Sequence, residues 1–177
     1  VLLISLVATL NAQIDKFAIS KLLDIDNLGY YTLAVSIAMG ILVFVSPISV
    51  ALLPRFTALY SNRKIEEASE LFKKVNLIVS IFIFSFMANM MFYGKELIWV
   101  WTGSLELAQK AGAFLPPLSL SFAMLALATI PYDVAIANGY TKLNNILGIL
   151  SLVITMPGYW LATEHFGALG AAYVYCI

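Results

Sequence analysis

Apolar stretches long enough to cross a lipid bilayer recur along the whole of this 177-residue chain. A membrane-spanning helix needs about 20 mostly apolar residues. Five stretches reach this length and a sixth begins before the chain stops. The predicted spans cover residues 1–23, 30–53, 75–93, 113–137, 146–163 and 168–177. The pattern predicts an all-α, polytopic membrane helix bundle.

The composition supports this prediction and excludes other classes of protein. Hydrophobic residues make up 62% of the chain and charged residues 11%, against about 25% charged residues in soluble domains. The positive and negative side chains balance, so no excess of positive charge points to nucleic acid. One His and one Cys are too few for a protein metal site, and no motif indicates a cofactor.

The ends of the chain suggest that it is a piece of a longer protein. It begins at Val1 rather than at a methionine, and it stops at Ile177 inside an apolar run. We therefore expect residues 1–177 to form a single transmembrane helical lobe of a larger membrane protein, with its targeting signal elsewhere.

Basic residues predict how the bundle is oriented, because short loops rich in Lys and Arg stay in the cytoplasm. The loops after the second and fourth predicted spans contain Arg55, Arg63, Lys64, Lys73, Lys74 and Lys142. The opposite side has Lys21, Lys95 and Lys110. We expect the first group to face the cytoplasm. Six aromatic residues near the predicted outer boundary fit an interfacial belt: Tyr30, Tyr31, Tyr93, Trp99, Trp101 and Trp160.

Two predicted loops have local structure of their own. Residues 63–74 are expected to form a short amphipathic helix on the cytoplasmic face, with Asn62 as its N-cap. Residues 95–101 form an interfacial segment, and Ser104 caps the helix that follows. Asp133 lies near the end of the fourth span, where we expect an interfacial role with Lys142. Prolines inside the spans are expected to kink them.

A polar stripe follows one face of the first predicted span. At about 100° per residue, its members fall within an arc of roughly 80°. They are Ser5, Thr9, Gln13, Lys16 and Ser20, with Asp15 on a neighbouring patch. Charged side chains at membrane depth are costly and usually face a bundle interior or a water-filled cavity.

Two interpretations of this stripe stay open. The side chains line a transport cavity, or neighbouring helices satisfy them in a purely structural role. Asp15 and Lys16 point about 100° apart, so they are expected to be poorly placed to pair with each other. Asp15 is the candidate for carrying a coupling ion.

No enzyme constellation is present in the sequence. There is no nucleophile elbow, no usefully spaced pair of carboxylates and no phosphate-binding glycine loop. The predicted outer loops are short, so a membrane enzyme of polysaccharide assembly is disfavoured.

The order of motifs resembles a known transporter family. These motifs are QIDKFAISKLLDIDNLGYYTLAVSI, SPISVALLPRFTALYSN, GKELIWVWTGSLELAQKAGAFL, IPYDVAIANGYTKLNNILG and FGALGAAYVY. The order of these motifs along the chain is similar to that in the polysaccharide-repeat (O-antigen, Wzx-type) flippases, which share a superfamily with multidrug and toxin extruders. The chain resembles the start of the second of two six-helix lobes.

The resemblance implies a function as well as a fold. It implies two lobes that alternate inward and outward access in the inner (cytoplasmic) membrane. The cargo would be an undecaprenyl-pyrophosphate-linked oligosaccharide for O-antigen, lipopolysaccharide or other cell-envelope export. Thr9, Gln13, Asp15, Lys16 and Ser20 would line the cavity. The alternative is a multidrug extruder coupled to H⁺ or Na⁺.

Overall fold

The computed structural model describes residues 13–175, except the side chains of residues 14, 141, 143–145 and 152. All regular structure in this part of the chain is helical. The helices are α2 (Ile14–Leu22), α3 (Ile25–Ala38), α4 (Gly40–Ser61), α5 (Ile65–Thr102), α6 (Leu105–Gly112), α7 (Leu115–Ala137) and α8 (Thr141–Val174).

The predicted fold class, an all-helical membrane bundle, is confirmed. Within residues 13–175, four helical segments are long and apolar enough to cross a membrane. They are Ile25–Ser61, Ile65–Thr102, Leu115–Ala137 and Ile146–Val174. The first segment joins α3 and α4 across Met39, whose backbone is itself helical. Only the last part of the first predicted span is described, as α2, and its earlier residues lie outside the described range.

The predicted separate helix at residues 63–74 is wrong. Those residues form the first turns of α5, which continues without interruption into the apolar span. Asn62 is the C-cap of α4 rather than an N-cap, and its side-chain amide donates to the carbonyl of Ala58. The reason is packing: Ala68 is buried against α4, so this amphipathic face meets a helix and not the membrane surface.

The C-terminal end of α5 agrees better with the predictions from the sequence. Residues 95–101 continue α5 beyond a break at Tyr93, where the backbone angles leave the helical range. Gly103 then ends the helix in the left-handed conformation that glycine adopts without penalty. Ser104 caps α6 as predicted, because its hydroxyl accepts a hydrogen bond from the amide of Leu107.

A second break divides α8 at Gly167. Its φ of 63° and ψ of −154° lie in a region that is essentially restricted to glycine. The segment after Gly167 turns back along the first part of the same helix, so that Gly170 lies against Ala162 and Gly158 against Val174. Small residues at these positions let the two backbones approach closely.

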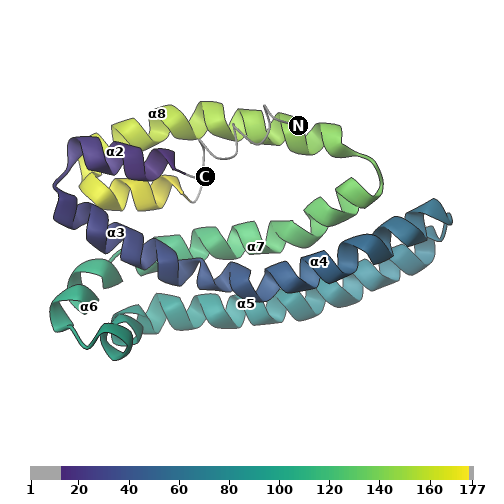
Figure 1. The fold of residues 1–177 in the computed structure, drawn as a ribbon, viewed down its shortest axis with the longest axis horizontal. Helices are drawn as coiled ribbons and strands as arrows, with labels where there is room; N and C mark the ends of the chain where they lie inside the picture. The colour runs from purple at the N-terminus through teal and green to yellow at the C-terminus, as the bar shows by residue number, and fades with distance from the viewer. Residues whose placement is uncertain (1–12, 176–177) are drawn as a thin grey trace.

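Figure 1 shows how the helices are arranged. The antiparallel pair of α4 and α5 packs along α7, and α2 packs on α8. The turn between α4 and α5 and the turn between α7 and α8 lie towards one end of the bundle. The turn from α2 to α3, together with α6, lies at the other end. The main apolar core lies among these helices, and a smaller cluster around Phe56 joins α4, α5 and α7.

Candidate transport site

A carboxylate is completely buried among the helices. Asp15 stands near the start of α2 with none of its surface exposed. Its Oδ2 accepts a hydrogen bond of 3.0 Å from the hydroxyl of Tyr31 on α3, which is also fully buried. Its Oδ1 has no hydrogen-bond partner among the described residues. A buried carboxylate with one oxygen that lacks a hydrogen bond is costly for the fold, which makes it a candidate for a functional role.

Lys16 lies beside this carboxylate, contrary to the expectation that the two side chains would not pair. The Lys16 ammonium nitrogen is 3.8 Å from Asp15 Oδ1, and the lysine side chain is 30% exposed. The 100° angle between the two positions is bridged because the lysine stem is long and flexible. The Asp15 side chain is therefore buried inside the bundle, while the Lys16 side chain reaches the surface of the bundle.

Aromatic side chains from α7 and α8 gather around the tyrosine and its carboxylate. Tyr31 makes an edge contact with Phe114 at 5.9 Å between ring centroids. Tyr175 lies 6.2 Å from Tyr159 and 5.2 Å from Phe122. Both α8 tyrosines are close enough to interact electrostatically with Tyr31. The two arms of α8, before and after the break at Gly167, thus each place a tyrosine beside the site.

Thr163 adds a second unused polar group to α8. Its hydroxyl oxygen is buried and has no hydrogen-bond partner among the described residues. Buried polar atoms without a hydrogen-bond partner are rare in folded proteins. Here α2 and α8 each contain such an atom, and the two helices pack against each other.

The remaining members of the predicted stripe are placed differently. Gln13 is exposed at the N-cap of α2 and makes no side-chain capping bond. Ser20 is also exposed, and its hydroxyl bonds to the carbonyl of Phe17 in its own helix. Ser5 and Thr9 lie outside the described residues. Of the five predicted site residues, the structure brings together Asp15 and Lys16.

A second buried carboxylate lies at the other end of the bundle. Asp133 on α7 is 5% exposed and accepts a hydrogen bond from the hydroxyl of Ser49 on α4. The expected pairing with Lys142 is wrong, because Asp133 faces α4 while Lys142 is exposed at the start of α8. This hydrogen bond ties α4 to α7 in a region that is otherwise apolar.

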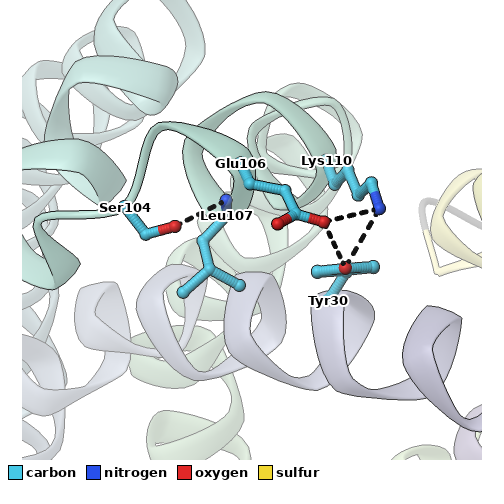
Figure 2. Close-up of polar contacts among 5 residues, drawn as sticks. All are labelled: Tyr30, Ser104, Glu106, Leu107 and Lys110. Carbon is cyan, nitrogen blue, oxygen red and sulfur yellow. Dashed lines mark hydrogen bonds and ion pairs between the residues drawn. The ribbon is translucent and has the colours of Figure 1, made fainter.

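A polar triad joins α3 to α6 at the end of the bundle opposite the α4–α5 turn (Figure 1 and Figure 2). Lys110 donates hydrogen bonds to Glu106 at 2.8 Å and to the hydroxyl of Tyr30 at 3.2 Å. The Tyr30 hydroxyl donates to Glu106 at 3.3 Å. The hydrogen bond and charge of Lys110 hold the pKa of Glu106 below its ordinary value. Hydrogen bonds to Glu106 and Tyr30 raise the pKa of Lys110. Glu106 and Lys110 therefore both stay charged around neutral pH.

Sequence reasoning missed the tyrosine that holds the carboxylate. Tyr31 was expected in an interfacial aromatic belt, whereas it is fully buried. Trp99 and Trp101 in the same predicted belt are exposed, as such a belt requires. The signal for Tyr31 was its place in α3. It shares a face with Ala34, Val35 and Ala38, one or two helical turns away, and all three are buried.

Comparison with known protein families gives a match. The family model described as MatE matches residues 1–161. No curated protein and no solved structure matches the chain. The matched range contains the buried carboxylate, its tyrosine partner on α3 and most of α8.

Proposed function

Because the chain belongs to the MatE family of multi-pass membrane transporters, which are not enzymes, we propose that it takes part in moving a lipid-linked oligosaccharide across the cytoplasmic membrane. The cargo class is an undecaprenyl-pyrophosphate-linked repeat unit for cell-envelope polysaccharide. The observation that carries the proposal is Lys16, a partly exposed cation on α2, the described end of the first predicted span, beside a buried carboxylate. A pyrophosphate group crossing a medium of low dielectric constant needs such a compensating cation.

The pair also suggests how transport is coupled, and transporters of this family couple to H⁺ or Na⁺. While Asp15 is ionised, it compensates the charge of Lys16. When Asp15 takes up a proton, that compensation is lost and the positive charge becomes available to an anion. Protons and an anionic cargo should therefore strengthen each other's binding. The other titratable groups around Asp15 are tyrosines on α3 and α8.

A cation-coupled multidrug extruder is the second candidate, and the carboxylate itself favours it. Asp15 is fully buried, and one of its oxygens has no hydrogen-bond partner among residues 13–175. A cationic drug would bind to this carboxylate in competition with the coupling ion. The two candidates thus predict opposite signs of coupling between protons and cargo.

Binding to the full-length protein in nanodiscs would separate these candidates. The probes are undecaprenyl pyrophosphate and the lipophilic cation tetraphenylphosphonium, each titrated at neutral and mildly acidic pH. We expect acid to strengthen binding of the pyrophosphate, and Asp15→Asn to abolish this pH dependence. Lys16→Ala should weaken binding at least about tenfold, and Lys16→Arg should retain part of it because the charge survives.

The matched control is Lys21→Ala, which removes an exposed lysine from the last turn of the same helix. It should leave pyrophosphate binding unchanged. Binding of tetraphenylphosphonium that weakens in acid, together with an unaffected Lys16→Ala variant, would refute the flippase and support the extruder.

A further inference from the structure

The hairpin of α4 and α5 carries a set of basic side chains at one level. Arg55 stands six residues before the end of α4, about 9 Å from it at 1.5 Å per residue. Lys73 and Lys74 stand about 12–14 Å beyond the start of α5. Because the two helices run antiparallel from a tight turn, these three side chains lie within about one helical turn of each other in height. We refer to Arg55, Lys73 and Lys74 as the basic collar.

The collar is free to bind anions. All three side chains are exposed, and none takes part in an ion pair with another described residue. The acidic residues of the hairpin, Glu66, Glu67 and Glu70, come earlier in α5, towards its tip. One of them, Glu67, is already paired with Lys64 at 2.8 Å. The tip therefore carries charges of both signs, Arg63 and Lys64 beside the three glutamates, whereas the collar carries positive charge alone.

The collar coincides with an edge of the apolar span. Residues 75–94 of α5 contain no charged residue and are followed by Lys95. These 20 residues extend about 30 Å, which matches the hydrocarbon thickness of a bilayer. Directly beyond the collar, Leu77 and Ile78 are 63% and 56% exposed. Exposed aliphatic side chains at this place fit contact with acyl chains, which puts the collar at the level of the lipid headgroups.

We propose that the basic collar binds the phosphate headgroups of anionic phospholipids and fixes the depth of the α4–α5 hairpin in the membrane. The charge bias of the sequence puts this end at the cytoplasmic leaflet, whose anionic lipids attract basic segments beside membrane helices. The smaller apolar cluster around Phe56 stiffens the hairpin at this height. Bound lipid would thus act on a rigid element. This inference does not depend on the identity of the cargo.

The test measures which lipids stay bound to the full-length protein. Nanodiscs contain phosphatidylcholine mixed with phosphatidylglycerol, and native mass spectrometry of the released complexes gives the ratio of the two retained lipids. We expect phosphatidylglycerol to be enriched over its share in the bilayer. Each cation near the surface contributes about 1 kcal/mol, or roughly fivefold in lipid partitioning.

A matched pair of double variants locates the effect. Lys73→Gln with Lys74→Gln should lower the enrichment at least about fivefold. Arg63→Gln with Lys64→Gln removes the same charge from the tip of the hairpin, and enrichment should stay near that of the parent. If the first double variant does not fold, Arg55→Gln alone tests the same collar and should lower enrichment by up to about fivefold.

Three outcomes would overturn the proposal. The collar variants could retain as much phosphatidylglycerol as the parent, or the tip variants could lose as much as the collar variants. Undecaprenyl pyrophosphate could also displace phosphatidylglycerol from the parent but not from the collar variants when both are present at equal concentration. That last result would assign the collar to cargo rather than to bilayer phospholipid.

Discussion

The reversal of α8 at Gly167 leads to a quantitative prediction for Gly170. A methyl group added there would be driven into the backbone carbonyl of Ala162, on the opposite arm of the same helix. A backbone atom cannot rotate away as a side chain can, so the two arms would have to separate. Forced contacts in a packed interior cost about 1–3 kcal/mol. Alanine regains about 1 kcal/mol relative to glycine in a helix. We expect Gly170→Ala to destabilise the protein by up to about 2 kcal/mol.

Two other glycines of α8 provide controls of the same chemistry. An added Cβ at Gly158 would lie 3.3 Å from a methyl group of Val174, which can adjust by a few tenths of an ångström. A Cβ at Gly148 would have no neighbour within 4 Å. We therefore expect Gly158→Ala to be nearly neutral. Gly148→Ala should be neutral or stabilising by up to about 1 kcal/mol.

The assay is reversible unfolding of the full-length protein in mixed detergent micelles, followed by tryptophan fluorescence. Only the ranking of the three variants by free energy of unfolding is needed, because all three are Gly→Ala substitutions in the same helix of the same protein. The reasoning would be refuted if Gly170→Ala were as stable as Gly148→Ala, since the close approach of the two arms could then not exist.

Three further predictions concern the carboxylate, the triad and the arrangement of helix ends. Tyr31→Phe removes a buried hydrogen bond to a charged group and should lower the free energy of unfolding by about 1.5–3 kcal/mol, whereas the exposed control Tyr173→Phe should have almost no effect. The pKa of Glu106 is lowered in the folded protein, so the stabilisation by ionised Glu106 is present above its ordinary pKa of 4.5 and is lost as the pH falls through the lower, folded-state value. Amide hydrogen exchange in α6 should therefore accelerate in that acid range by more than the intrinsic exchange rate changes. Glu106→Gln should remove this acceleration. Single cysteines at Asn62 and Ser104, in a background without the native cysteine, should react with impermeant thiol reagents from opposite sides of the membrane; labelling from one side would contradict the arrangement of the helix ends.

The helical fold could be predicted from the sequence because its signals are local. Span length depends only on consecutive apolar residues. The cap at Ser104 depends on a hydroxyl three residues before the amide it accepts from. The turn at Gly103 depends on one residue that tolerates positive φ. The cap and the turn are each decided within one helical turn, and a span is decided within one continuous segment.

Features that depend on contacts between distant segments could not be predicted in this way. Asn62 is of a residue type common at N-caps, but the packing of α5 on α4 makes it the C-cap of the preceding helix. The non-helical backbone within the described helices lies at Tyr93 and Gly167 rather than beside the prolines. The pairing of Asp15 with Lys16 required three-dimensional placement, because a helical wheel shows the direction of a side chain but not its reach.

The break at Tyr93 gives α5 the mechanics of a lever with its fulcrum near one face of the membrane. The arm from residue 65 to residue 92 is about 42 Å long at 1.5 Å per residue. A tilt of about 10° at the fulcrum would sweep its far tip through roughly 7 Å while residues 94–102 and α6 stayed in place. Small rearrangements on one side of the bilayer would thus be magnified on the other, and whatever holds the long arm at the membrane surface would set the force needed to move it.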